Sequence, residues 1–204
     1  MIHEIRTYDL KPGSLGQFLE RFGEKIERRV EFSPLVGFFY TEIGPLNRVV
    51  HIWEYEDESA REEVRGKAAA DGNWPPDTSE FTVNVQADIF TPAPFLPKLE
   101  IKRNIGPLFE LRTYTYADGD IPKVIDAWGP VIEARMELSQ PVGIWSLQEG
   151  DRNVWLHMWS YKSYEQRTER RKKFASIGWP PPAGVSPVTM ENMLLNAAPF
   201  SPVQ

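Results

Sequence analysis

The chain has 204 residues, and its 23 basic residues against 29 acidic ones give a formal net charge of −6. This balance argues against nucleic-acid binding, which requires a positive surface. The absence of cysteine excludes disulfides, thiolate catalysis, zinc–thiolate sites and iron–sulfur clusters, and no apolar run approaches the roughly 18 residues of a membrane span.

The first half of the sequence predicts a strand, a helix, two strands, a helix and a closing strand. Residues 2–10 alternate and are rich in β-forming types, which predicts a strand at the start of the chain. With no basic and apolar leader before it, we expect a cytoplasmic protein. The further elements are a helix over 15–30, strands over 35–43 and 48–55, a helix over 57–70 and a strand near 81–90.

The second half repeats the first at a spacing of 106 residues. Glu4-Ile5-Arg6-Thr7-Tyr8 returns as Glu110-Leu111-Arg112-Thr113-Tyr114, and His51-Ile52-Trp53-Glu54-Tyr55 returns as His157-Met158-Trp159-Ser160-Tyr161. A third of the positions over 2–55 are identical to their counterparts over 108–161, without a gap. A repeat of this length indicates two domains of one fold, which we place at 1–92 and 107–204 with a proline-rich linker at 93–106.

The predicted elements of the second half differ from those of the first mainly at one point. The helix that begins after Asp120 contains Gly129-Pro130, where the proline ring is expected to kink it. Strands follow over 142–148 and 154–161 around Glu149-Gly150-Asp151-Arg152-Asn153, then a helix over 163–177 and a strand near 187–196. The order βαββαβ, twice, predicts an α+β protein of two ferredoxin-like domains, each with both helices on one face of its antiparallel sheet.

Strand alternation divides the repeated residues between two faces of each sheet. Ile5, Ile52 and their counterparts share one face, which we expect to lie under the helices. The polar and aromatic residues share the other, and we expect these faces of the two sheets to pack together and enclose a cavity for an organic ligand. The candidate ligand-binding residues are Glu4, Arg6, Tyr8, His51, Trp53, Tyr55, Glu110, Arg112, Tyr114, His157, Trp159 and Tyr161.

Each candidate also has a purely structural interpretation. His51 and His157 are candidates for general acid/base catalysis, or they are imidazoles hydrogen-bonded to a neighbouring strand. Neither has a nearby histidine at metal-ligand spacing, so we expect no metal site. The Glu-x-Arg pairs that open each copy favour an internal ion pair, and the alternative is an arginine that anchors a carboxylate or enolate.

Two further sequence features have their own interpretations. The basic run over 167–173 is interleaved with glutamates and is interpreted as a solvated helix face. Trp74 and Trp179 each precede prolines, and we expect them to plug a barrel end or to bind across the domain contact. No nucleotide-binding loop or Ser-His-Asp order is present.

The repeated motifs resemble those of the NIPSNAP family. The resemblance is carried by Glu-x-Arg-x-Tyr at the start of each copy, by Val-Gly-Phe-Phe and Val-Gly-Ile-Trp at the next strand, and by Trp-x-Tyr at the end of the third. It implies a dimeric α+β barrel, here formed within one chain. Relatives in that superfamily include cofactor-free monooxygenases, muconolactone-isomerase-like enzymes and haem-binding members. The family match does not require haem, and we expect no cofactor.

The expected function is binding of a small aromatic or polyketide-like molecule between the two sheets, with cofactor-free oxidation or isomerisation as its possible chemistry. The alternative is a non-catalytic interaction module whose repeated residues only fit the sheets together. A cavity of several hundred Å³ would favour the first, and a filled interface the second. We also expect a homodimer of these fused chains, because closing the barrel was expected to leave edge strands free.

Overall fold

The computed structural model describes residues 1–149 and 152–204 and contains the βαββαβ order twice. The first copy comprises β1 (Ile2–Leu10), α1 (Leu15–Val30), β2 (Leu35–Ile43), β3 (Arg48–Tyr55), α2 (Glu58–Ala70) and β4 (Thr82–Pro92). The second comprises β5 (Leu108–Thr115), α3 (Ile121–Trp128), α4 (Ile132–Leu138), β6 (Pro141–Glu149), β7 (Arg152–Tyr161), α5 (Tyr164–Lys172) and β8 (Thr189–Ala197). Short 3₁₀ turns lie at Gly129–Val131 and Ala175–Ile177.

Local sequence chemistry explains where several helices begin and break. The Asp57 side chain accepts a hydrogen bond from the backbone N–H of Ala60 and caps α2, and Ser163 caps α5 in the same way. The kink predicted at Pro130 is confirmed, because the 3₁₀ turn separates α3 from α4 at that point. The turn predicted at 149–153 includes Gly150 and Asp151, which lie outside the described residues.

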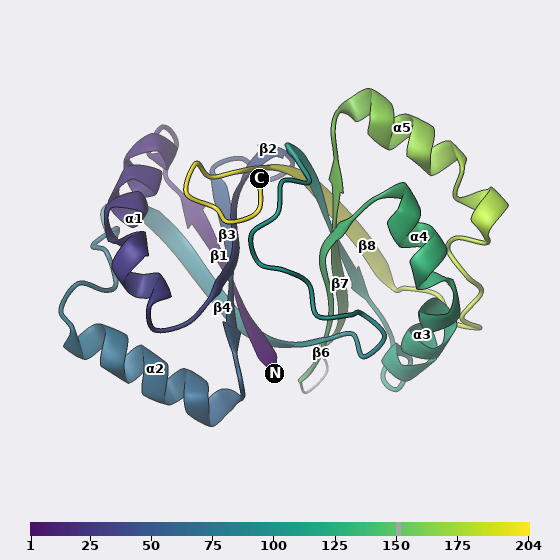
Figure 1. Cartoon of the computed structure of the whole chain (residues 1–204), viewed down its shortest axis with the longest axis horizontal. Helices are drawn as coiled ribbons and strands as arrows, with labels where there is room; N and C mark the ends of the chain where they lie inside the picture. The colour runs from purple at the N-terminus through teal and green to yellow at the C-terminus, as the bar shows by residue number, and fades with distance from the viewer. Residues whose placement is uncertain (150–151) are drawn as a thin grey trace.

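The eight strands form one closed barrel in the order β1-β3-β2-β8-β5-β7-β6-β4. Within each half the first strand lies between the third and the fourth, as a ferredoxin-like unit requires. The halves join at two seams, β2 with β8 and β4 with β6. The predicted fold class is therefore confirmed. Figure 1 shows the strands in the centre, with α1 and α2 on one side and α3, α4 and α5 on the other.

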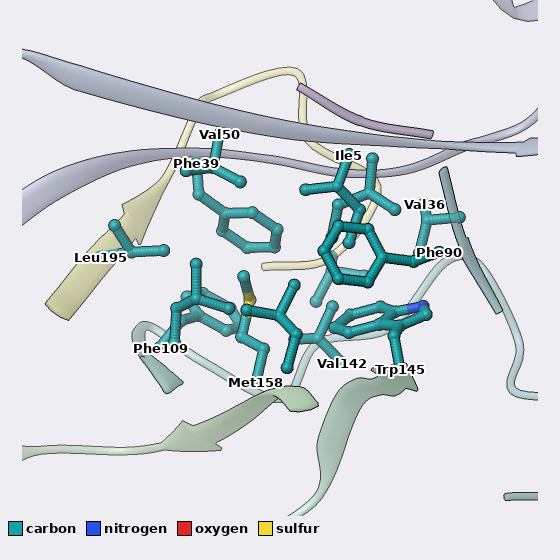
Figure 2. Packing of buried hydrophobic residues seen from close by; sticks show 14 of the residues in the cluster. Ile5, Val36, Phe39, Val50, Phe90, Phe109, Val142, Trp145, Met158 and Leu195 are labelled. Atoms are coloured by element: carbon teal, nitrogen blue, oxygen red, sulfur yellow. The ribbon is translucent and has the colours of Figure 1, made fainter. Parts of the chain in front are cut away.

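The aliphatic faces of the two sheets point into the barrel and fill it. Ile5, Phe39 and Val50 from one sheet meet Phe109 and other residues of the second sheet across the interior (Figure 2). This corrects the expectation that the aliphatic faces lie under the helices. Among the described residues, no helix side chain belongs to this interior core, so helices supply no partners for charges there, and the aliphatic residues are the ones that can be buried.

The linker and the C-terminal tail contribute to the same interior core. Ile105 of the linker and Val203 of the tail belong to it, and the segments are joined by a bridge between Arg103 and Val203. The Ile105 N–H donates to the Gln204 carbonyl at 2.6 Å. These two segments, rather than the Trp-Pro-Pro loops, therefore complete the barrel core.

The helices lie outside the barrel, each group over the outer face of its own sheet (Figure 1). On α1 the buried residues are Phe18, Phe22, Ile26 and Arg29, so one arginine shares the apolar stripe. Among the described residues, no helix combines the length and the apolar character needed to cross a bilayer.

Candidate functional site

Each half of the protein has a cavity between the outer face of its sheet and the helices that cover it. The cavity of the first half has a volume of about 120 Å³ and is lined by β1, β3, α1, α2 and the loop at Trp74-Pro75. The cavity of the second half has a volume of about 330 Å³ and is lined by β5, β7, α3, α4, α5 and the segment that leads into β8. We refer to them as the first and second cavities.

The candidate residues of each copy gather at its own cavity. All six of the second copy line the second cavity, namely Glu110, Arg112, Tyr114, His157, Trp159 and Tyr161. Five of the first copy line the first cavity, namely Arg6, Tyr8, His51, Trp53 and Tyr55, and the sixth, Glu4, is bonded to Arg6.

The expectation of one shared cavity between the sheets was wrong. The two groups of six lie on opposite outer sides of the barrel, because the sheets meet through their aliphatic faces (Figures 1 and 2). The helices bring arginines to the polar faces, and a buried carboxylate needs such partners. The strand face that carries the charges therefore turns towards the helices.

The glutamate in each copy is buried in a cluster of arginines. Glu110 accepts from Arg112 at 2.8 Å and from Arg167 at 2.6 Å. Burial alone would raise the pKa of Glu110, but these two guanidinium groups outweigh it and hold the pKa below its ordinary value. Glu4 is held in the same way by Arg6 and Arg61, at 2.7 and 2.8 Å. The favoured ion-pair interpretation of the Glu-x-Arg motif thus describes contacts that exist in both copies.

The histidines are oriented by the tryptophans two residues later. Trp159 Nε1 donates to His157 Nδ1 at 2.7 Å, and Trp53 Nε1 donates to His51 Nδ1 at the same distance. Burial, reinforced by nearby arginine charges, holds the pKa of both imidazoles well below the ordinary value. A neutral imidazole that accepts at Nδ1 must carry its proton on Nε2. Each Nε2 is buried without a hydrogen-bond partner in the described part of the chain.

This geometry narrows the chemistry available to the histidines. With Nδ1 occupied and Nε2 protonated, His157 can donate a hydrogen bond to a ligand oxygen. It cannot accept a proton at Nε2 without first changing tautomer and losing the tryptophan hydrogen bond. The arrangement therefore favours stabilising an oxyanion over abstracting a proton.

One further arginine in each half reaches its cavity, Arg29 from α1 and Arg135 from α4, and neither was among the predicted site residues. The Arg135 guanidinium carbon lies 3.7 Å from the Trp159 ring centroid, and Arg29 lies 4.1 Å from that of Trp53. A signal for them was present in the sequence. Both stand at helical spacing on an otherwise apolar stripe, three residues after Ile132 and Ile26, and they occupy equivalent repeat positions.

The basic run over 167–173 is only partly a solvated face, which corrects its interpretation. Arg167 binds Glu110, and Arg171 lies 4.0 Å from the same carboxylate and lines the second cavity. Their counterparts, Arg61 and Arg65, bind Glu4. Repeat equivalence was the signal that could have identified them.

Aromatic side chains form most of the remaining wall of the second cavity. Trp179 from the Trp-Pro-Pro loop packs edge-on against Trp128 and Trp159, with ring centroids 4.4 and 6.0 Å away. Trp74 contacts Phe22 and Trp53 in the first half. The expectation that these loop tryptophans plug a barrel end was therefore wrong, because both close a helix-side cavity.

Among the described residues, no group of three or more histidine, aspartate or glutamate side chains is arranged to hold a metal ion. The tyrosines of the second cavity stay protonated at neutral pH. Burial raises the pKa of Tyr114 and of Tyr161, and it raises the pKa of Tyr116 to about 12. The cavity therefore offers neutral phenols and imidazole, arginine cations and one engaged carboxylate.

Comparison with known proteins identifies the family. The NIPSNAP family model matches twice, at residues 3–97 and 109–202. The chain belongs to the NIPSNAP family. The resemblance inferred from the motifs is thereby confirmed. Protein NipSnap homolog 3A of Homo sapiens is 29% identical over 222 residues, covering 100% of this chain and 86% of that protein. For homolog 3B of Homo sapiens the values are 30% over 216 residues, with 99% and 85% covered.

The barrel of this NIPSNAP protein is similar to that of proteins outside the family. A putative monooxygenase from Lactobacillus acidophilus aligns with a TM-score of 0.69 over 95% of this chain and 92% of that chain. Its sequence is 12% identical, so the likeness concerns the fold alone.

Proposed function

We propose that this NIPSNAP protein binds a small aromatic organic anion in the second cavity. The observation that carries the proposal is the cavity of about 330 Å³, which is within the lower range of small-molecule sites. Tryptophan and tyrosine rings supply flat apolar walls, and arginine and imidazole N–H groups supply the polar contacts. A ring system bearing a negative charge satisfies both sets of groups.

An entrance to this cavity lies beside the outer face of the barrel. Arg171 and Met190 line the cavity, and they are 40% and 55% exposed. A ligand can therefore enter between α5 and the start of β8. A cation at this entrance attracts an anionic ligand before it meets the buried donors.

Cofactor-free oxidation or isomerisation is the second candidate. It is favoured by the His157 Nε2–H, a neutral donor in a buried site, which would stabilise the oxyanion of an enolate or phenolate. The described residues that line the cavity include no carboxylate except the engaged Glu110. A substrate would therefore be one that ionises readily by itself. A hydroxynaphthoate tested in an oxygen electrode checks this step, and oxygen uptake equal to that of buffer would exclude it for that substrate.

Two measurements test the binding proposal. Native mass spectrometry of freshly purified protein reports any retained organic ligand. Titration with naphthoate should quench tryptophan fluorescence, because Trp128, Trp159 and Trp179 line the cavity. Failure of naphthoate and of related aromatic acids to quench would favour the alternative, a non-catalytic interaction module.

We also infer that two chains associate as a homodimer, although the barrel is already closed within one chain. The support that remains is the outer face of β4, where Val83 and Val85 are 68% and 42% exposed. Exposed apolar residues on a strand near a sheet edge favour pairing with another copy.

A further inference from the structure

The two cavities carry the same charged groups, so charge alone does not distinguish them. Each half brings four arginines to one buried glutamate: Arg6, Arg29, Arg61 and Arg65 surround Glu4, and their counterparts Arg112, Arg135, Arg167 and Arg171 surround Glu110. Any difference in ligand binding must come from the space around these groups and from their hydrogen bonds.

Space differs because the first half fills the region around its histidine with phenylalanine. Phe38 stacks on His51 with ring centroids 4.9 Å apart, and Phe18 lies 5.4 Å from the Tyr8 ring. At the equivalent repeat positions the second half has Ile144 and Val124. The smaller side chains agree with the difference between about 120 and about 330 Å³.

Hydrogen bonding differs between Arg29 on α1 and its counterpart Arg135 on α4. Arg29 Nη1 donates to Ser33 at 2.8 Å and its Nη2 donates to Tyr55 at 2.8 Å. Arg135 Nη2 donates to Tyr161 at 3.3 Å, and its Nη1 and Nε have no hydrogen-bond partner among the residues described. Because Arg29 Nε is unpartnered as well, the two halves differ at Nη1, which is bonded to Ser33 in the first half and unbonded in the second, although Ser139 stands at the repeat position of Ser33.

The unpartnered N–H donors of Arg135 are costly unless a ligand accepts from them. The residue is 2% exposed, and its guanidinium faces are covered by the rings of Trp159 and Phe174. Stacking covers the faces of the group but leaves the in-plane N–H donors unbonded. Burial lowers the pKa of Arg135 to about 10, so the group remains a cation at neutral pH. A buried cation with unbonded donors is a site for an anion.

We infer that the second cavity alone takes a ligand, that this ligand is a planar aromatic carboxylic acid, and that its carboxylate accepts a hydrogen bond from Arg135 Nη1. The inference rests on the proposed function and adds to it the ligand's acidic group and the number of ligands per chain. The first cavity is a smaller structural counterpart, in which Phe38 stacks on His51 and Ser33 accepts a hydrogen bond from Arg29. One ligand therefore binds per chain.

Calorimetric titration with naphthoate, using the full chain, tests this inference through matched variants. The wild type should bind one equivalent, and naphthol, which lacks the carboxylate, should bind at least about tenfold more weakly. Arg135→Met should weaken naphthoate binding by at least about tenfold, and its melting temperature should fall less than that of Arg29→Met, since Arg135 makes one hydrogen bond where Arg29 makes two. Arg29→Met should melt at a lower temperature, because it breaks two hydrogen bonds, but should keep the wild-type affinity.

A second pair of variants changes the side-chain volume beside the histidine of each cavity and leaves the charged groups unchanged. Ile144→Phe should abolish naphthoate binding while the protein stays folded, since phenylalanine is accommodated at the twin position 38. Phe38→Ile should leave the affinity and the single equivalent unchanged. Two equivalents per chain, unchanged affinity in Arg135→Met or Ile144→Phe, or equal binding of naphthol would overturn the inference while the proposed function stands. Absence of binding by every aromatic acid would defeat the proposed function itself.

Discussion

At each of His51 and His157, burial and the indole donor keep the imidazole neutral in the folded protein, with its pKa well below the ordinary 6.5. In the unfolded chain both regain an ordinary pKa, so below pH 6.5 the unfolded state binds more protons than the folded state. The free energy of unfolding should therefore fall as pH falls from 6.5 towards 5, by at most about 1.4 kcal/mol per pH unit for each histidine. Urea unfolding at stepped pH measures this slope.

Histidine substitutions show how much of this pH dependence of the unfolding free energy each imidazole contributes. His157→Gln and His51→Gln should each reduce it by the contribution of one proton, and the double variant by that of two. Glutamates with a lowered pKa, such as Glu110, also add to the slope near pH 5. They add equally in the wild type and the variants, so the difference between the slopes isolates the histidines. A slope unchanged in the double variant would show that neither imidazole is held neutral.

The Glu–Arg clusters give a second prediction at this scale. Glu110→Gln should reduce the free energy of unfolding by about 3–5 kcal/mol, because Arg112 and Arg167 lose their shared carboxylate inside the protein. Arg112→Met should cost less, about 1–3 kcal/mol, because Glu110 keeps Arg167. Chemical denaturation of both variants measures the order. If the arginine variant proved the less stable of the two, Arg167 would not be an effective partner.

The sequence identified most of the polar residues around each cavity but not the side of the sheet on which they lie. Alternation correctly placed Arg112, His157 and Trp159 on one face. It does not reveal whether a face meets helices or another sheet, because that depends on where charged partners come from. The helix partners of Glu110 are Arg167 and Arg171 on α5. Repeat equivalence marks these positions in the sequence, but it does not say which face of the sheet they meet.

At the scale of the strand, the Val-Gly-x-aromatic motif has a steric cause. A Cβ atom added at Gly143 would lie 2.1 Å from the Trp145 ring, and one at Gly37 would lie 2.4 Å from the Phe39 ring. Each aromatic side chain folds back over the glycine into the barrel core. Gly143→Ala should therefore displace Trp145 and reduce the free energy of unfolding by about 1–3 kcal/mol.

Thermal or urea denaturation measures this loss, and Gly66 provides the control. It lies inside α2 with no heavy atom within 4 Å of its added Cβ. Gly66→Ala should consequently stabilise the protein, by up to about 1 kcal/mol. Equal effects of the two substitutions would contradict the steric explanation of the motif.

The helices and strands were largely predictable from hydrophobic periodicity and from the positions of proline and glycine. The helix predicted over 15–30 is α1, and the break at Pro130 appears as predicted, because proline geometry acts locally. The helix predicted over 163–177 instead ends at Lys172 and is followed by a 3₁₀ turn. Gly178 adopts a left-handed conformation there, and the loop then carries Trp179 back into the second cavity, which depends on tertiary packing.

At the scale of the whole molecule, duplication gives the two halves separate roles in one barrel. Their aliphatic faces must match each other to close the interior, which constrains both copies equally. Their helix-side faces do not meet, so the cavities are free to diverge. The first half has Phe38 and Phe18 where the second has Ile144 and Val124. The motif residues recur because both copies need the same buried charge network, whereas the neighbouring positions determine whether any cavity remains.

Association of two chains is the prediction that belongs to this scale. The seam of β4 with β6 covers Thr91 and Pro92, and the earlier part of β4 pairs with β1. The stretch 82–87 carries no charge to oppose edge pairing. Sedimentation at micromolar concentration should give twice the 23.5 kDa of the chain, and Val85→Lys should restore the single mass by adding like charges across a two-fold axis. Leu46→Lys, on an exposed hairpin turn, is the control and should stay dimeric. A wild-type mass of one chain would show that barrel closure alone protects these strands.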